Sequence, residues 1–209
     1  MLDLYVVTHP EATHHLADQV GGWYDSELTP AGLQDADLVA AALRERVAGS
    51  PPALFTSDLR RARQTAGAIG ARLGVEPVPL AGLREKSYGE GEGRPDAWFR
   101  ERFVPPPAHG ERMDHDEGLV GAETKRQWVD RVYAGMDVVM GSTTPTRIVV
   151  THGGSAGVVI AHWLRLPRTA LAHAAFRVGP GSITHLHEDD YFHNRTLMSL
   201  GDTTHLRRT

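Results

Sequence analysis

Short apolar runs alternate with longer stretches of helical spacing along most of the chain. Runs rich in β-branched and other apolar residues, typical of buried strands, lie at 2–8, 52–57, 75–83 and 146–154. Apolar residues three and four positions apart predict helices at 30–47, 59–74, 122–141 and 155–163. Two further apolar runs, 181–188 and 191–200, predict a hairpin. This alternation predicts an α/β fold, a three-layer α/β/α sandwich around a mostly parallel sheet.

Capping residues mark the ends of two of these helices. Thr29 is expected to be an N-cap, with Pro30 as the first helical residue. Ser57 or Asp58 is expected to cap the helix at 59–74, and Gly74 is expected to end it in the left-handed conformation.

The periodicity fails between residues 89 and 121, where Gly, Pro and charged residues dominate. Such a stretch predicts an inserted loop with one short helix, and insertions of this length usually act as lids or binding loops. We therefore expect a single domain over residues 1–209, with a lid insertion at about 89–121.

Composition removes several classes of protein. The 209 residues suit one domain, and a formal net charge of −4 does not indicate a nucleic-acid partner. The chain has no cysteine, which excludes disulfides and thiolate chemistry. It shows neither a signal peptide nor an apolar stretch of membrane-spanning length, so we expect a cytoplasmic protein with no membrane partner.

The tetrapeptide Val-Val-Thr-His occurs twice, ending at His9 and at His152. Each copy ends a predicted strand and is followed by a chain-breaking Pro or Gly-Gly. Because ligands of α/β sheets bind beyond the carboxyl ends of the strands, both histidines are expected at one site. An imidazole can attack phosphorus, and a second imidazole can stabilise the phosphoryl oxygens.

Two more charged residues follow predicted strands and complete a candidate phosphate site. Arg61 lies in the first turn of a predicted helix, where free amides and the helix dipole also favour anions. Its guanidinium can bind phosphate through two hydrogen bonds. Glu85 comes directly after the third strand, and a carboxyl group in a partly desolvated cleft can protonate a leaving oxygen.

Six segments, "VVTHPE", "LTPAG", "FTSDLRRARQTA", "LREKSYGEGEG", "GAET" and "VVTHGG", occur in one order, with "GDTTHL" near the C-terminus. In these motifs the chain resembles the histidine phosphatase superfamily, also called phosphoglycerate-mutase-like, over nearly its full length. The resemblance implies that His9 is the phosphorylated nucleophile and that Glu85 is the proton donor. It also implies that Arg61 and His152 line the phosphate pocket, and that no metal or cofactor is needed.

The chain departs from this family in its first motif. Where the family has Arg-His-Gly-Glu, this sequence has Thr8-His9-Pro10-Glu11, which removes a cation and a backbone N–H from the phosphate site. Where the family often has asparagine, this chain has His15, preceded by His14, and both are candidates to replace the arginine as neutral donors or cations.

The remaining site predictions concern phosphate and substrate contacts. We expect Thr8, His15 and Gly153 to help Arg61 bind phosphate. Residues expected to contact the rest of the substrate are Tyr88, Trp98 and Arg100.

Several functions remain open. The first is a phosphatase acting on a small-molecule phosphomonoester, with a homodimer compatible with the sequence. A mutase comes second, because it needs two adjacent arginines where this chain has Phe99-Arg100. A third is a catalytically weak or repurposed member that acts as a binding module or in other acid–base chemistry. A metallohydrolase comes last, because the sequence shows no ligand spacing for a metal. Apolar and acidic residues of the insertion favour a substrate with an apolar or sugar portion.

Overall fold

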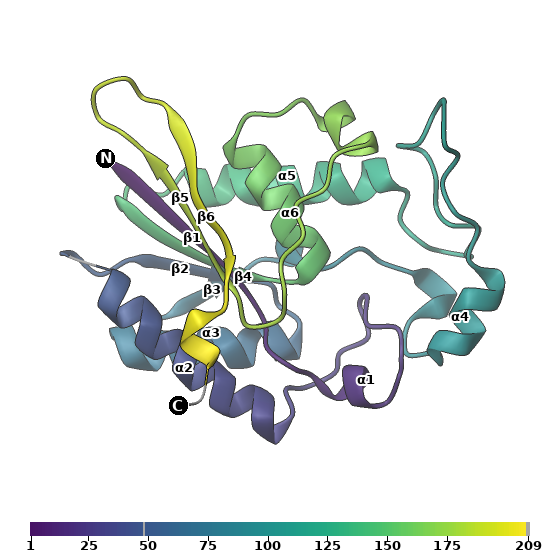
Figure 1. Ribbon diagram of the computed structural model, residues 1–209, viewed down its shortest axis with the longest axis horizontal. Coiled ribbons are helices and arrows are strands. Elements are labelled where there is room, and N and C mark those ends of the chain that lie inside the picture. The colour runs from purple at the N-terminus through teal and green to yellow at the C-terminus, as the bar shows by residue number, and fades with distance from the viewer. Residues whose placement is uncertain (48, 208–209) are drawn as a thin grey trace.

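The computed structural model describes residues 1–47 and 49–207, which fold around one six-stranded sheet (Figure 1). The strand order is β3-β2-β4-β1-β5-β6. Strands β3, β2, β4 and β1 form a parallel part of the sheet. Strands β5 and β6 form an antiparallel hairpin, in which β5 pairs with β1. The strands are β1 (Leu2–Thr8), β2 (Ala53–Thr56), β3 (Pro77–Pro79), β4 (Thr146–Thr151), β5 (Ile183–Glu188) and β6 (Arg195–Asp202).

Helices cover both faces of this sheet. Figure 1 shows α2 and α3 on one side and α5 and α6 on the other, which confirms the predicted three-layer sandwich. The helices are α1 (Thr13–Leu16), α2 (Pro30–Arg46), α3 (Arg60–Leu73), α4 (Asp96–Arg102), α5 (Lys125–Met140) and α6 (Gly153–Trp163). Short 3₁₀ turns lie at Ala81–Leu83, Gly89–Gly91, Arg168–Ala172 and Thr204–Leu206.

The two cores follow from the alternation of side chains along the strands. In β1, Leu4 and Val6 pack among residues of α5 and α6, whereas Tyr5 and Val7 pack among residues of α2 and α3. All four are buried, as expected for a parallel strand covered on both faces. Among the described residues, no helix is both long and apolar enough to cross a bilayer.

The two Val-Val-Thr-His copies are neighbouring strands. Strands β1 and β4 pair in parallel with Thr8 opposite Thr151, so the histidine after each strand emerges at the same edge of the sheet. This register confirms the placement predicted for His9 and His152.

Three predicted boundaries need correction. The N-cap of α3 is Leu59, and neither Ser57 nor Asp58 caps α3 through its side chain. The third strand is only three residues long, because its prolines cannot donate ladder hydrogen bonds and the chain then turns into the 3₁₀ helix at 81–83. The second hairpin strand begins at Arg195, after a turn in which Asp189 accepts three backbone N–H groups.

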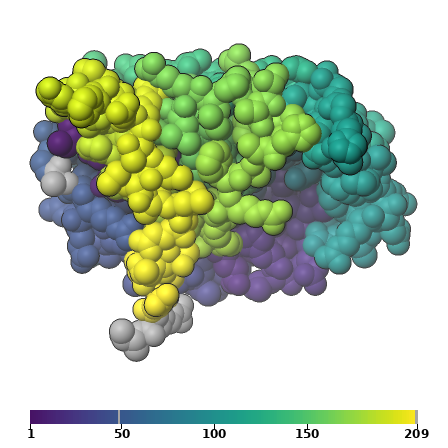
Figure 2. Space-filling view, turned by 45° about the horizontal axis from the view of Figure 1, so that its top comes forward, coloured from purple at the N-terminus to yellow at the C-terminus, as the bar shows by residue number. Residues whose placement is uncertain are grey.

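The insertion at 89–121 carries one short helix, α4, and its two ends meet at a bridge between Tyr88 and Ala122. Gly89 has a φ of +53°, and a Cβ there would lie 2.2 Å from the carbonyl oxygen of Val120. In Figure 2 the insertion (teal) lies at one end of the molecule and the C-terminal hairpin (yellow) at the other. A buried ion pair between Lys86 and Glu117 joins the insertion to the segment that carries Glu85.

Thr29 is the N-cap of α2, as predicted. Its Oγ1 accepts from the Gly32 N–H at 2.9 Å and donates to Glu11 Oε1 at 2.7 Å. We therefore expect Thr29→Ala to lower the free energy of unfolding by about 1 kcal/mol, within a range of roughly 0.5–2 kcal/mol. Thr29→Ser keeps the hydroxyl and should retain most of the stability. Urea unfolding measures both, and an alanine variant as stable as the serine variant would contradict the role of the cap.

Candidate active site

Hydrogen bonds hold His9 so that one ring nitrogen is unprotonated. Its Nδ1 lies 2.8 Å from the carbonyl oxygen of Pro10, an acceptor only, so Nδ1 carries the proton. Its Nε2 accepts a hydrogen bond from Arg61 Nε at 3.2 Å. Burial and the neighbouring Arg61 cation lower the pKa of His9 well below 6.5. His9 is therefore a neutral imidazole with an unprotonated Nε2, the form that can act as a nucleophile.

His152 lies beside His9 at the end of the adjacent strand, with 5.1 Å between the ring centroids. Its Nε2 is 2.8 Å from Ser57 Oγ, and its buried Nδ1 has no hydrogen-bond partner among the described residues. Burial, followed by the charge of Arg61, lowers the pKa of His152 well below 6.5. A polar atom buried in this way requires a partner, and a ligand in the pocket lined by His152 can supply one.

Arg61 supplies the cation at this site. It is only 1% exposed, and its guanidinium donates to the carbonyl oxygens of Tyr24 at 2.7 Å and Gly22 at 2.8 Å. Burial lowers the pKa of Arg61 to about 10, so it stays charged at neutral pH. Three of its five N–H groups are used in these bonds and in the bond to His9, which leaves two for an anion.

Glu85 lines the same pocket and is hydrogen-bonded to the start of α6. Its carboxylate accepts from the N–H groups of Gly154 at 2.8 Å and Ser155 at 3.1 Å, and from Ser155 Oγ at 3.2 Å. The N-terminus of a helix favours a negative charge, so this position holds the carboxylate firmly. The prediction that Glu85 and Arg61 share one cleft with both histidines is confirmed.

His14 and His15 fill the space on the far side of His9. His15 stacks on His9 with 5.8 Å between ring centroids, and His14 lies 2.7 Å from Ser26 Oγ through its Nδ1. His15 Nδ1 accepts from the Ala12 N–H at 3.0 Å, so a neutral His15 carries its proton on Nε2.

Both of these histidines are neutral at neutral pH in the unliganded pocket. Burial, then the charges of His15 and Arg61, lowers the pKa of His14 to about 3. Burial and Arg61 also lower the pKa of His15. Of the two roles predicted for them, the geometry supports neutral donors.

Thr8, predicted as a phosphate ligand, lines the pocket, but its hydroxyl group is engaged with another loop. Its hydroxyl donates to the carbonyl oxygen of Gly179 at 2.5 Å, and Ser182 N–H donates to the hydroxyl oxygen at 3.1 Å. Thr8 is 2% exposed and instead joins β1 to the loop before β5. The single hydroxyl proton is therefore not free for an anion.

Two of the predicted substrate contacts also lie elsewhere. Trp98 and Arg100 are on α4 and do not line the pocket. Trp98 stacks with Arg94 and Arg102, while the exposed Arg100 pairs with Asp96. Both side chains contact other residues of the insertion instead of the pocket. The aperiodic sequence of the insertion does not predict this orientation.

The catalytic pocket encloses about 260 Å³. Tyr88 and Gly153 line it as predicted, and burial, followed by the charge of Glu85, raises the pKa of Tyr88, which keeps the phenol protonated. The lining residues are Thr8, His9, His14, His15, Gly21, Gly22, Arg61, Glu85, Tyr88, His152, Gly153, Val178 and Pro180.

Sequence reasoning missed several contributors to this site, including Gly21 and Gly22, which line the pocket. Ser57 holds His152, Ser155 holds Glu85, and the loop with Val178 and Pro180 closes one wall. Ser57 directly follows a strand, which is the one signal that marked it as a site residue. The loop gave no signal, because it is placed by tertiary contacts such as the hydrogen bond from Thr8 Oγ1 to the carbonyl oxygen of Gly179, two residues that lie 171 positions apart.

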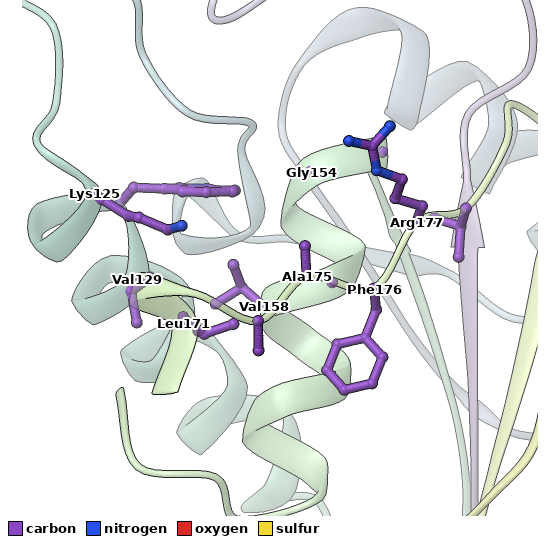
Figure 3. A pocket seen from close by; sticks show the side chains of 13 residues that line it. Lys125, Val129, Gly154, Val158, Leu171, Ala175, Phe176 and Arg177 are labelled. Carbon is purple, nitrogen blue, oxygen red and sulfur yellow. The ribbon is translucent and has the colours of Figure 1, made fainter. Parts of the chain in front are cut away.

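A larger cavity of about 390 Å³ adjoins the catalytic pocket, and the two share Gly153 and Val178. Figure 3 shows its apolar lining, with the Lys125 amine on one side and Arg177 on the other. The apolar lining residues are Trp128, Val129, Val158, Leu171, Ala174, Ala175 and Phe176. Lys125 is half-buried, and no ion pair within the described part of the chain involves its amine.

Comparisons with known proteins agree with this geometry. A sequence model of the histidine phosphatase superfamily (branch 1) matches residues 4–201. The chain is 30% identical to a probable phosphoglycerate mutase GpmB of Yersinia pestis (strain Pestoides F), over 99% of this chain and 95% of that relative.

Solved structures share the fold. A mycobacterial glucosyl-3-phosphoglycerate phosphatase in complex with VO3 is similar with a TM-score of 0.77 and 23% identity, over 97% of this chain and 100% of that one. A phosphoserine phosphatase variant from Entamoeba histolytica, in complex with phosphoserine, is similar with a TM-score of 0.74 and 24% identity, over 99% and 100%. Identities this low show a common fold.

The depressed pKa of His14 predicts how stability varies with pH. A histidine in the unfolded chain titrates near 6.5, whereas the pKa of folded His14 is about 3. The free energy of unfolding therefore keeps the full contribution of His14 above about pH 6.5. This contribution falls as the pH decreases below about 6.5, because only the unfolded chain then binds the proton. His14→Gln keeps a polar group beside Ser26 and should reduce proton uptake on unfolding by about one between pH 6 and pH 4.5.

Urea unfolding at a series of pH values measures this uptake. His173→Gln is the matched control, because His173 is exposed and outside the pocket. The control should keep the wild-type slope. An unchanged slope in His14→Gln would show that His14 is not held neutral in the folded state.

Proposed function

Because the chain belongs to the histidine phosphatase superfamily, we propose that it is a phosphatase that hydrolyses a small phosphomonoester through a phosphohistidine on His9. One observation carries this proposal: the unprotonated Nε2 of His9 points at the buried Arg61 cation, in a pocket that Glu85 also lines. A nucleophile, a cation for the phosphoryl oxygens and a carboxyl group for proton transfer are the groups that such a reaction needs.

The first step transfers the phosphoryl group. His9 Nε2 attacks phosphorus, a P–N bond forms, and the bond from phosphorus to the alcohol oxygen breaks. In the unliganded pocket the start of α6 holds Glu85 as a carboxylate, and the negative charge of the bound ester favours uptake of a proton. Glu85 then gives this proton to the leaving oxygen, so the alcohol departs neutral. In the second step water attacks the phosphorus of the phosphohistidine, and Glu85 takes a proton from that water. The P–N bond breaks, phosphate is released, and His9 returns to the neutral imidazole.

The remaining groups suit the charge on the phosphoryl oxygens. Arg61 has two N–H groups left after its three described bonds. His15 can donate from Nε2, and the buried Nδ1 of His152 lacks a partner among the described residues. Neutral donors replace the positive charge lost at Thr8, so we infer weaker binding of free phosphate than in a site with two arginines.

Two alternatives have less support. The similarity to a probable phosphoglycerate mutase makes a mutase the second candidate. However, Arg100, the arginine considered for a mutase, does not line the catalytic pocket. A binding module or other acid–base chemistry needs no oriented nucleophile, whereas both ring nitrogens of His9 are engaged in a reactive arrangement. A cytoplasmic location and a homodimer stay predictions.

The adjoining cavity bears on the substrate. Because it is apolar and shares Gly153 and Val178 with the catalytic pocket, a phosphate at His9 would direct its alcohol portion toward the cavity. We therefore propose a phosphomonoester whose alcohol has an apolar portion. The unpaired Lys125 amine at the cavity wall is compatible with an additional carboxylate on that portion.

Covalent labelling tests the proposed mechanism. Brief exposure to a ³²P-labelled phosphomonoester, in the presence of EDTA, should leave an acid-labile phosphoryl group on wild-type protein. His9→Ala should abolish both labelling and turnover. Glu85→Gln should still be labelled by an ester with a good leaving group, such as p-nitrophenyl phosphate, because that alcohol leaves without a proton. Label on His9→Ala, or turnover only without EDTA, would refute the mechanism.

The cavity predicts a selective effect of filling it. Ala174→Phe should raise the KM for naphthyl phosphate by about tenfold or more, with little change for glycerol phosphate, because only the larger alcohol needs the space. Ala134→Phe is the matched control, since Ala134 is exposed on α5 and outside the cavity. Equal effects of Ala174→Phe on both esters would place the alcohol elsewhere.

A further inference from the structure

A cluster of three ligand-type side chains lies on the sheet far from the catalytic pocket. Asp3 of β1 faces His187 of the antiparallel strand β5, and His185 is two residues away on the same face. Asp3 Oδ1 is 2.8 Å from His185 Nε2 and 2.9 Å from His187 Nδ1. None of the three lines the catalytic pocket or the cavity beside it.

The strand pairing assembles these atoms in advance. The three ligand-type atoms lie within 4.8 Å of one another. Donors around a tetrahedral Zn²⁺, each at about 2.0–2.2 Å from the ion, lie roughly 3.3–3.6 Å apart, so side-chain adjustments of about 1 Å bring the three atoms to this spacing. His185 also stacks on Tyr5 with 4.6 Å between ring centroids, which limits rotation of the ligand.

We propose that Asp3, His185 and His187 form a binding site for a divalent first-row transition-metal ion of the Zn²⁺ type. Two imidazole nitrogens and one carboxylate oxygen are a donor set that suits such ions and suits Mg²⁺ or Ca²⁺ poorly. The side chains are 27%, 24% and 24% exposed for His185, His187 and Asp3, so water can complete the coordination.

Ion binding requires only local proton changes. The ring nitrogens that face Asp3 must lose their protons before they can bind an ion. A neutral His185 then binds through Nε2 with its proton on Nδ1, and a neutral His187 binds through Nδ1 with its proton on Nε2. Asp3 binds as the carboxylate. Although burial opposes ionisation, hydrogen bonds from His185 and His187 lower the pKa of Asp3 below its usual value.

The site would stabilise the fold without taking part in catalysis. Asp3 is near the start of β1 and His9 follows its other end, six residues further along and about 20 Å away in extended chain. An ion there would join β1 to β5, the junction between the parallel part of the sheet and the hairpin. Binding to the folded chain alone raises its stability by mass action.

Titration of untagged protein with Zn²⁺, after removal of bound metal by EDTA and dialysis, tests the proposal. Calorimetry should show one site, and Co²⁺ should give visible absorption bands typical of a nitrogen- and oxygen-bound ion. Asp3→Asn and His187→Gln should each weaken Zn²⁺ binding by tenfold or more. Wild-type binding that is unchanged in both variants, or no binding in the wild type, would overturn the proposal.

Two controls separate this site from other histidines. His193→Gln alters an exposed histidine of the hairpin turn and should leave binding unchanged. His15→Gln tests whether Zn²⁺ binds instead at the histidines of the active-site pocket. If this variant no longer bound Zn²⁺ while His187→Gln still did, the proposal would also be overturned.

Thermal unfolding with EDTA checks that the ligand variants fold. Zn²⁺ should raise the Tm of the wild type but not of His187→Gln. Hydrolysis of a phosphomonoester in EDTA does not depend on this result. Failure of the metal site would therefore leave the proposed phosphatase mechanism intact, and failure of that mechanism would leave the metal site intact.

Discussion

The parallel register of β1 and β4 is the constraint on which the rest of the site depends. Thr8 lies opposite Thr151, so the chain releases His9 and His152 at one edge of the sheet, with 5.1 Å between their rings. A shift of one residue would turn the side chains of the shifted strand to the opposite face and exchange residues between the two cores, which would disrupt the packing of both. The buried alternation of β1 therefore stabilises the fold and positions the candidate nucleophile through the same contacts.

Electrostatics at this edge are set by one buried cation among neutral imidazoles. Arg61 is held by backbone carbonyls of residues 22 and 24, and its charge adds to burial in lowering the pKa values of His9 and His152. A pocket with this charge distribution attracts an anion and keeps the nucleophile unprotonated. The replacement of the family's first arginine by Thr8 fits this arrangement, because Thr8 serves the loop at 179–182 and the neutral His15 occupies the far side of His9.

The two ends of the sheet carry different chemistry. At the carboxyl end, the candidate active-site pocket adjoins an apolar cavity between α5, α6 and residues 171–178, which would give the proposed substrate room for an apolar group. At the other end, Asp3, His185 and His187 offer ligand atoms where β1 meets the hairpin. The sheet separates these sites, so substrate chemistry and the proposed metal site can be tested independently.

The sequence by itself determined the layers of the fold and the four central site residues. Strand and helix periodicities are local. His9 and His152 each follow a strand and Arg61 lies in the first turn of α3, whereas Glu85 follows the 3₁₀ helix Ala81–Leu83; the motif order marks all four positions. Tertiary structure alone decided that Thr8 bonds Gly179, that Trp98 and Arg100 do not line the pocket, and that Ser57 and Ser155 hold His152 and Glu85. These outcomes depend on contacts between distant segments and on the path of an aperiodic insertion, which no local pattern encodes.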